Sequence, residues 1–370
     1  MLQHEIEEAQ RLVKTDAYQM SIGEIVNMYK DNELVINPDF QRLFRWEPRQ
    51  KSKLIESILL GIPLPPIFVY ERNDGVWELI DGLQRMSTIL EFMGVLRAPG
   101  MQSTKPPSFL GETKYLPSLN NTVWEKTSAI DGLSVDDQVE LDKEHHLAIR
   151  RARLGVEILK RPSDSQTKYD LFQRLNAGGT RANPQELRNC IMIMVSEPFF
   201  KMVKELGDHG SYRAVLAASP DQIIRQHHME WASRFLVHSD LPYDRKLDVG
   251  DFIDEGVIKL AENGNLPEMA KHFKDTFDLL NSAVGSNALR RHLGGNPVGR
   301  VSLAAFECIA VGIGANLDAI KLQSDAGQFV RDRVEKFWED PALESFFTPG
   351  LRGTVRIQRT IPFGKNFFAP

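Results

Sequence analysis

Short stretches of helical and alternating periodicity follow one another between Ser21 and Phe92. A helical start is followed by an extended piece around Leu34–Ile36, and then by a helix from about Pro48 to Leu60. The apolar side chains of that helix fall on one side, at Leu54, Ile55, Ile58 and Leu59. Proline is favoured in the first helical turn, and Gly61 followed by Pro63 ends the segment, so both helix boundaries are predicted.

The next segment has the pattern of a β-hairpin that leads into a helix. Pro66–Tyr70 and Val76–Ile80 flank Asn73-Asp74-Gly75, a sequence typical of tight turns between antiparallel strands. The second strand ends at Asp81-Gly82, and a helix is then predicted to about Met93. A strand, a glycine turn and a helix N-terminus in succession form a geometry that binds anions.

The remaining pattern predicts a second, helical domain. Ala98–Asp142 is rich in Pro, Ser, Thr and Asn and is expected to be an insertion with a short helix or two. Arg153–Leu159 is predicted to return a strand to the first sheet, and Asn183 caps a helix that runs through Met194. Helix after helix follows from about Pro198 to Trp338. We therefore expect one domain over residues 15–195, with its insertion at about 98–142, and an all-helical domain over residues 196–370.

Composition narrows the class of protein. The 370 residues carry a formal charge of −5, so any contact with nucleic acid needs a local basic patch. The two cysteines, Cys190 and Cys308, lie among apolar residues, which argues against a disulfide framework or a zinc site. No apolar run approaches the length that spans a bilayer, and the first 14 residues have no apolar core, so a cytoplasmic protein without membrane contact is expected.

The run from Asp81 to Thr88 is the strongest candidate for chemistry. Gly82 lets the backbone approach a ligand, Arg85 offers a planar cation for phosphate oxygens, and Ser87 and Thr88 add hydroxyl groups. Asp81 is a candidate ligand for Mg²⁺, which proteins often hold with one or two carboxylates plus phosphate oxygens. A plain turn followed by a solvated arginine is the alternative interpretation.

Two further clusters have a polar character that packing alone also explains. In Pro38–Trp46, Gln41, Arg42 and Arg45 alternate with aromatic residues, an arrangement that can stack on a base and hold a phosphate. The alternative is an edge segment with buried rings. The third cluster is Phe172–Asn176, with Gly178, Gly179, Arg188 and Asn189. Taken alone, a simple connection between helices and an ordinary helix face explain it better.

Taken together, the three clusters resemble the N-terminal domain of GmrSD-type restriction endonucleases. The family pattern Pro-x-(Tyr/Phe)-Gln-Arg-x-(Tyr/Phe)-x-Trp corresponds to residues 38–46, Asp-Gly-Gln-Gln-Arg-x-(Ser/Thr)-Thr to residues 81–88, and Phe-x-Arg-Leu-Asn-x-Gly-Gly with Glu-Leu-Arg-Asn to residues 172–189. The resemblance covers about two-thirds of the chain, in a stand-alone form without the C-terminal His-Asn-His nuclease domain that relatives often carry. Residues 230–235 are similar to the family's helical follow-on.

The resemblance implies an α+β fold, in which a ParB/sulfiredoxin-like N-terminal domain with a small mixed sheet precedes the helical domain. It further implies binding and hydrolysis of a nucleoside triphosphate, coupled to prokaryotic anti-phage or restriction-type defence against foreign DNA. The implied catalytic residues are Asp81, Gln84 and Arg85. The implied nucleotide contacts are Gln41, Arg42, Gly82, Ser87, Thr88, Arg174, Asn176 and Arg188, with Arg45 and Trp46 as base or nucleic-acid contacts.

Two departures from the family pattern change these expectations. The first glutamine of Asp-Gly-Gln-Gln-Arg is Leu83 here, so hydrolysis is weak if that glutamine positions water. No His-containing nuclease motif is present, so a separately encoded nuclease subunit is the expected partner, beside a nucleoside triphosphate, Mg²⁺, foreign DNA and a second copy of the chain. A sensor that binds nucleotide or DNA without turnover, and a ParB-like DNA nickase, are the alternatives.

Overall fold

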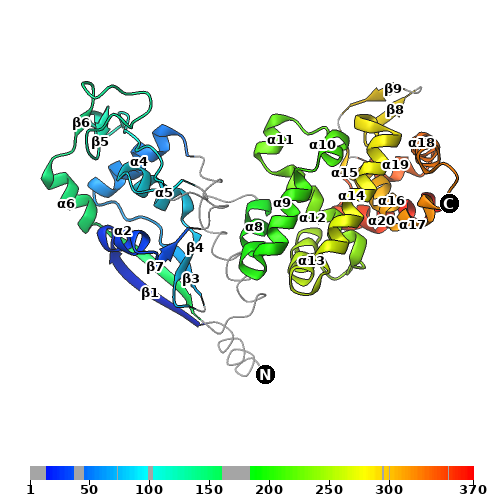
Figure 1. Ribbon diagram of the computed structural model, residues 1–370, viewed down its shortest axis with the longest axis horizontal. Coiled ribbons are helices and arrows are strands. Elements are labelled where there is room, and N and C mark those ends of the chain that lie inside the picture. The colour runs from blue at the N-terminus through cyan, green and yellow to red at the C-terminus, as the bar shows by residue number, and fades with distance from the viewer. Residues whose placement is uncertain are drawn as a thin grey trace. The chain divides into compact units, whose positions relative to one another are not determined.

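The computed structural model describes residues 14–36, 46–72, 74–98, 103–160, 184–293, 296–299, 301–348 and 350–370. The chain divides into two units, Met1–Leu175 and Asn176–Pro370 (Figure 1). The helix Pro184–Val195, with which the first predicted domain ends, falls in the second of these units.

A five-stranded mixed sheet forms the frame of the first unit. Its order is β1 (Lys14–Ser21), β7 (Arg153–Lys160), β3 (Ile67–Glu71), β4 (Trp77–Asp81) and β2 (Leu34–Val35). The pairs β1–β7 and β3–β4 are antiparallel, and the pairs β3–β7 and β2–β4 are parallel. The predicted α+β fold with a small mixed sheet, the hairpin and the returning strand are thus confirmed. Strand β1 was not predicted.

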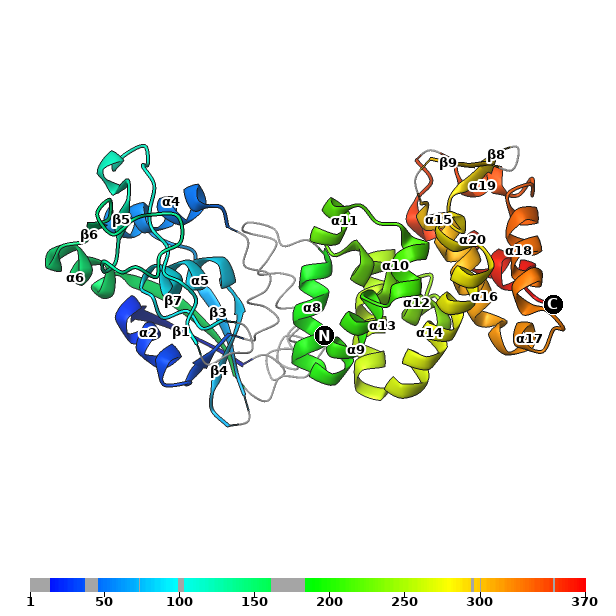
Figure 2. The ribbon, with the colours of Figure 1, turned by 45° about the horizontal axis from the view of Figure 1, so that its top comes forward.

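The hydrophobic core of this unit lies between the sheet and its helices. Alternate residues of β7, namely Leu154, Val156 and Ile158, are buried against the same core as Ile67 and Leu79. Residues between them along β7 are more exposed, as expected for a sheet with one covered face. The helices that cover it are α2 (Ile22–Lys30), α4 (Pro48–Leu59), α5 (Leu83–Phe92) and α6 (Lys143–Arg151) (Figures 1 and 2).

The segment predicted as an insertion has little regular structure. Its described part contains one 3₁₀ turn at Pro117–Leu119 and the two-residue strands β5 (Thr122–Val123) and β6 (Val139–Glu140). Helix α4 anchors this segment, because Ser52 Oγ accepts a hydrogen bond from the Gly111 amide at 2.9 Å. Glu56 Oε1 likewise accepts from the amides of Tyr115 and Leu116 at 2.9 and 3.1 Å.

The second unit is largely helical. It also contains a hairpin of β8 (Arg291–Leu293) and β9 (Asn296–Val298), which the prediction of an all-helical domain missed. The helices are α8 (Pro184–Val195), α9 (Glu197–Gly207), α10 (Gly210–Leu216), α11 (Pro220–Ile224), α12 (His227–Asp240), α13 (Val249–Asn263), α14 (Leu266–Ala283), α15 (Leu303–Ala305), α16 (Val311–Ala315), α17 (Leu317–Lys321), α18 (Ala326–Phe337), α19 (Leu343–Phe346) and α20 (Gly353–Phe367). A 3₁₀ turn (Gly285–Asn287) and a π-helical turn (Phe306–Ala310) connect some of these helices.

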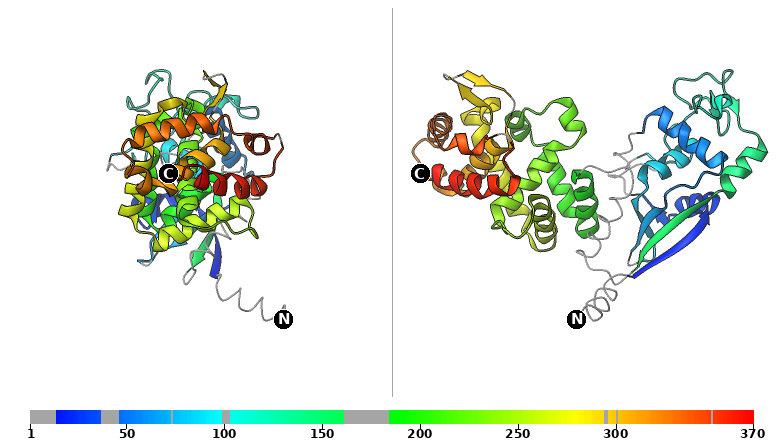
Figure 3. Two further views of the ribbon diagram at one scale, coloured as in Figure 1. Left: turned by 90° about the vertical axis from the view of Figure 1, so that its right-hand side faces the viewer. Right: turned by 180° about the vertical axis from the view of Figure 1, so that it is seen from behind.

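Residues near the C-terminus fold onto this unit. Helix α20 packs against α16 and the π-helical turn, and it is the red helix in both panels of Figure 3. Phe368 is fully buried, and Arg356 forms an ion pair with the buried Glu307, whose carboxylate oxygens lie 2.9 and 3.0 Å from the guanidinium. The basic, aromatic stretch near the C-terminus is therefore part of the helical unit, with Phe368 buried and Phe363 and Phe367 partly buried.

Candidate functional site

The turn between β4 and α5 depends on a glycine. Strand β4 ends at Asp81, Gly82 has φ = 96°, and α5 begins at Leu83 without a side-chain cap. A Cβ at Gly82 would lie 2.5 Å from Ile67 Cγ2, so a larger residue would have to displace the neighbouring strand. The β3–β4 register also shifts between Phe68 and Val69, opposite the end of β4. Such irregularities redirect side chains beside functional sites.

Across this turn, Asp81 and Arg85 form an ion pair. Arg85 Nη2 donates to Asp81 Oδ2 at 3.2 Å and to the carbonyl oxygen of Pro66 at 3.0 Å. The side chains are 15% exposed for Arg85 and 37% for Asp81, so the guanidinium is the more enclosed group. Arg85 Nε is buried and has no hydrogen-bond partner. The arginine is therefore held in place by part of its guanidinium, and one donor remains unused.

Gln84 connects this turn to the first predicted cluster. Its Oε1 accepts a hydrogen bond from the Trp46 amide at 3.1 Å, so the last residue of that cluster lies beside the helix start. The Trp46 indole is partly buried and packs on the hydrophobic core, which fits the alternative interpretation of this aromatic residue. Gln41, Arg42 and Arg45 lie outside the described residues, and their predicted contacts stay predictions.

The two hydroxyl residues of the motif face the protein interior. Ser87 and Thr88 are both fully buried. Thr88 Oγ1 donates to the Gln84 carbonyl oxygen at 2.7 Å, and Ser87 Oγ has no hydrogen-bond partner. In this conformation neither hydroxyl lies on the surface where a nucleotide would bind, so their predicted contacts require α5 to move.

The predicted third cluster is split between the two units. Arg174 and Asn176 lie outside the described residues. Arg188, on α8, is only 2% exposed, and its Nε is bonded to the carboxylate of Asp254 on α13. Its Nη1 lies 3.9 Å from Glu230 Oε1 on α12. The positive charge of Arg188 is therefore used to join helices of the second unit, which sequence spacing did not reveal.

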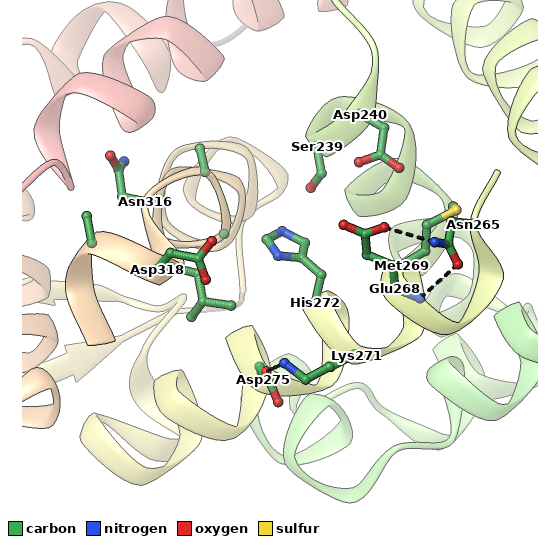
Figure 4. Close-up of a pocket in the computed structure, with 14 residues that line it drawn as sticks. Ser239, Asp240, Asn265, Glu268, Met269, Lys271, His272, Asp275, Asn316 and Asp318 are labelled. Carbon is green, nitrogen blue, oxygen red and sulfur yellow. Dashed lines mark hydrogen bonds and ion pairs between the residues drawn. The ribbon is translucent and has the colours of Figure 1, made fainter. Parts of the chain in front are cut away.

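Sequence reasoning also missed a polar pocket of about 800 Å³ in the second unit (Figure 4). His272 lies near its centre, with Ser239, Asp240, Glu268 and Asp318 around it. Burial lowers the pKa of His272 and raises the pKa of Asp240. The spacing of Glu268, His272 and Asp275 on one helix face was the available signal.

This pocket is acidic, and its residues are not arranged as a metal centre. Among the described residues, no group of three or more His, Cys, Asp or Glu side chains could hold a metal ion. Asp275 is paired with Lys271 and Lys321, whose Nζ atoms lie 3.3 and 2.7 Å from Oδ2. These hydrogen bonds, that of Lys321 first, hold the pKa of Asp275 below its ordinary value.

The fold and the turn define an α+β domain in which a strand, a left-handed glycine and a helix N-terminus present an arginine–aspartate pair. A sequence model of the GmrSD restriction endonuclease N-terminal domain matches residues 22–193. Residues 22–193 therefore belong to the family of GmrSD N-terminal domains, which confirms the resemblance. Searches of curated proteins and of solved structures found no match. The predicted likeness to ParB and sulfiredoxin stays a prediction.

In the part of the chain that the structure describes, no helix is both long and apolar enough to cross a membrane.

Proposed function

We propose that this protein binds and hydrolyses a nucleoside triphosphate as a subunit of a prokaryotic restriction-type defence system that acts on foreign DNA. The defence role rests on the GmrSD family membership of residues 22–193. The nucleotide role rests on one observation above all, which is the Asp81–Arg85 pair across the Gly82 turn. In this proposal a separately encoded subunit supplies nuclease activity.

In the proposed site, both backbone amides and side chains bind the phosphate groups. No side chain caps the N-terminus of α5, which favours phosphate oxygens at this helix start, and glycine lets the ligand approach it. The positive charge of Arg85, whose side chain is 15% exposed, would stabilise a second phosphate oxygen. Gln41 and Arg42 would contact the nucleotide from the segment that ends at Trp46, and Arg174 and Asn176 complete the expected set. Arg188 is not part of this proposed site.

Asp81 fits the role of a Mg²⁺ ligand. Its Oδ2 is bonded to Arg85, the described residues give Oδ1 no partner, and the side chain is more than a third exposed. A single carboxylate together with phosphate oxygens and water is a common way for proteins to hold Mg²⁺. The ion would neutralise the phosphate charge, while Arg85 keeps the carboxylate oriented.

Leu83 favours a second candidate function, a sensor that binds nucleotide without turnover. The family pattern has glutamine at this position, and here the first residue of α5 is an apolar side chain packed partly on the core. If that glutamine orients the attacking water, its absence leaves binding intact and slows hydrolysis. Leu83→Gln would then raise the rate of phosphate release, with little change in nucleotide affinity.

Phosphate release from each nucleoside triphosphate with Mg²⁺, measured with the full chain in the presence and absence of DNA, tests the proposal. Arg85→Ala should lower kcat/KM by about 10- to 100-fold, because charge-assisted hydrogen bonds contribute roughly 1.5–3 kcal/mol. The matched control is Arg72→Ala, which removes an exposed arginine paired with Asp74 in the hairpin turn of the same unit.

Each outcome separates the candidate functions. Nucleotide binding without phosphate release by the wild type supports the sensor. Metal-dependent DNA strand breaks by the pure protein, lost in Asp81→Ala, support the nickase. Equal activity of Arg85→Ala and Arg72→Ala would exclude the Asp81–Arg85 turn as the nucleotide site.

A further inference from the structure

The second unit contains another cavity, of about 520 Å³, with a chemistry opposite to that of the pocket around His272. It lies where α10, α11 and α12 meet the segment on either side of the β8–β9 hairpin. The polar and aromatic side chains that line it include Ser219, Asp221, Arg225, His227, Trp231 and Arg290. Its size falls within the range of small-molecule sites.

Two arginines outnumber the one carboxylate that lines this cavity, so its lining is net positive. Arg225 is exposed, and no ion pair or side-chain hydrogen bond joins it to the described residues. Arg290 is half-buried, and its Nε is buried without a hydrogen-bond partner. The single lining carboxylate is Asp221. Unpaired guanidinium groups around one cavity favour a ligand with phosphate oxygens, which match their planar donors.

An aromatic side chain accompanies the two arginines. Trp231 lines the cavity, is partly exposed, and rests on the buried ring of Phe306, with the ring centroids 5.0 Å apart. The contact with Phe306 holds the indole in place. A fixed aromatic ring beside arginines is the combination that binds a nucleotide unit, because the base stacks on the ring while the cations hold its phosphate.

The backbone around the cavity is strained at two positions. Ala217, which lines the cavity, has φ = 44°, and Gln226, between Arg225 and His227, has φ = 61°. Neither residue type favours this left-handed region, and such strain concentrates at functional sites. The Gln226 side chain is held in place, because its Oε1 accepts a hydrogen bond from Asn189 Nδ2.

Two residues of the Glu-Leu-Arg-Asn motif therefore hold residues beside this cavity in place without lining it themselves. Asn189 holds Gln226, the N-cap residue of α12, and Arg188 faces Glu230, the neighbour of Trp231. Both motif residues are 2% exposed and line no part of the cavity. They are positioning residues, and they connect the family motif to the cationic, aromatic face of the second unit.

We propose that this cavity binds a nucleotide unit, a planar base with its phosphate, either free or within a single strand of nucleic acid. Trp231 stacks on the base, and Arg225 and Arg290 bind the phosphate. The cavity lies within the second unit, so this inference is independent of the nucleotide site proposed at the Asp81–Arg85 turn.

Fluorescence anisotropy of a labelled oligo(dT) strand, titrated with the full chain at several salt concentrations, tests the proposal. Arg225→Ala should weaken binding by about tenfold and reduce the slope of log K against log salt by about 0.7, the value for one phosphate contact on a single strand. Trp231→Leu should weaken binding by about tenfold without changing that slope. Arg245→Ala, another exposed arginine of the same unit, is the control.

Competition by dTMP identifies the source of the ligand. If dTMP displaces the strand at a concentration close to the dissociation constant of the oligonucleotide, the ligand of the cavity is a free nucleotide. Resistance to dTMP supports a strand.

Several results would overturn the inference. They are binding by Arg225→Ala as tight as that of Arg245→Ala, no binding of either probe by the wild type, or loss of binding in Arg85→Ala alone. Because Arg225 is exposed, its variant should retain the wild-type melting temperature, and it decides the question if Trp231→Leu folds poorly.

Discussion

At Gly82, conformation and space act together. Its φ of 96° lies in the left-handed region, and an added Cβ would meet the side chain of Ile67. Gly75, in the hairpin turn of the same unit, has φ = 82° but no atom within 4 Å of such a Cβ. The two glycines therefore separate the cost of the backbone conformation from the cost of the contact.

Gly82→Ala should destabilise the protein by about 3 kcal/mol, the sum of left-handed strain and overpacking against β3. Gly75→Ala should cost about 1 kcal/mol, since only the backbone term applies. Urea denaturation measures both free energies of unfolding. If the two variants have the same free energy of unfolding, the contact between an added Cβ and Ile67 does not destabilise the protein.

His238 is a buried group that makes stability depend on pH. It is 2% exposed, stacks on Phe252, and its Nε2 has no hydrogen-bond partner. Burial, helped by the nearby cations Arg234, Lys365 and Arg356, lowers its pKa from 6.5 to about 3. The folded protein thus keeps this imidazole neutral at pH values where the unfolded chain is protonated.

Because the folded pKa is the lower one, the contribution of His238 is fully present above pH 6.5 and is lost as the pH falls toward 3. Between pH 7 and pH 5, this histidine alone should reduce the free energy of unfolding by about 2 kcal/mol. His238→Phe should remove that part of the loss in denaturant titrations at each pH. A further loss from His228, whose pKa burial lowers to about 4, remains.

Helix α8 shows which features of an element can be predicted from the sequence and which cannot. Its start was predicted from Asn183 and Pro184, and most helices and the hairpin were predicted from their turns and periodicity. The partner of Arg188 is 66 residues away, so no spacing could assign it. Strand β1 was missed because polar and apolar residues do not alternate clearly along Lys14–Ser21.

The Asp81–Arg85 turn was predictable for a local reason. The end of the strand, the glycine and the start of the helix are contiguous in the sequence. The residues that form the turn can therefore be recognised from the sequence alone. The cavity beside Trp231 was not predictable, because Arg225 and Arg290 meet there only through tertiary packing.

Removing one partner of the Arg188–Asp254 pair should be costly. Arg188→Ala or Asp254→Ala leaves an uncompensated buried charge, and we expect a loss of about 3–5 kcal/mol in chemical denaturation. The double variant Arg188→Met/Asp254→Leu should lose much less than the sum. For comparison, Lys201→Ala in the exposed pair with Glu197 on α9 should change stability by less than about 0.5 kcal/mol. Additive losses would show that the buried pair is not coupled.

For the whole molecule, the family match and the packing give different boundaries. The matched sequence ends at residue 193, near the end of α8, yet α8 contacts α9, α12 and α13 of the second unit. Its residues Ile191 and Met192 are buried. The end of the matched family domain and the boundary between the two packed units therefore lie at different residues.

A fragment that begins at residue 184 should consequently be more stable than one that begins at residue 196. Without α8, apolar surface of α9 and α13 is exposed to water, and Asp254 loses Arg188. Thermal unfolding followed by circular dichroism should show a cooperative transition for the longer fragment and a lower, broader one for the shorter. Coincident transitions would mean that α8 contributes nothing to this unit.

The ion pair between Glu307 and Arg356 has a consequence for the order in which the two units can form during synthesis. The Glu307 carboxylate is fully buried, and it is held by Arg356 and by Thr360, whose Oγ1 donates at 2.9 Å. Both partners come from α20, 49 and 53 residues later. The first unit has its last described strand once residue 160 has left the ribosome. The second unit must wait for α20, and until then its nascent helices carry an unpaired carboxylate that opposes closure of their core.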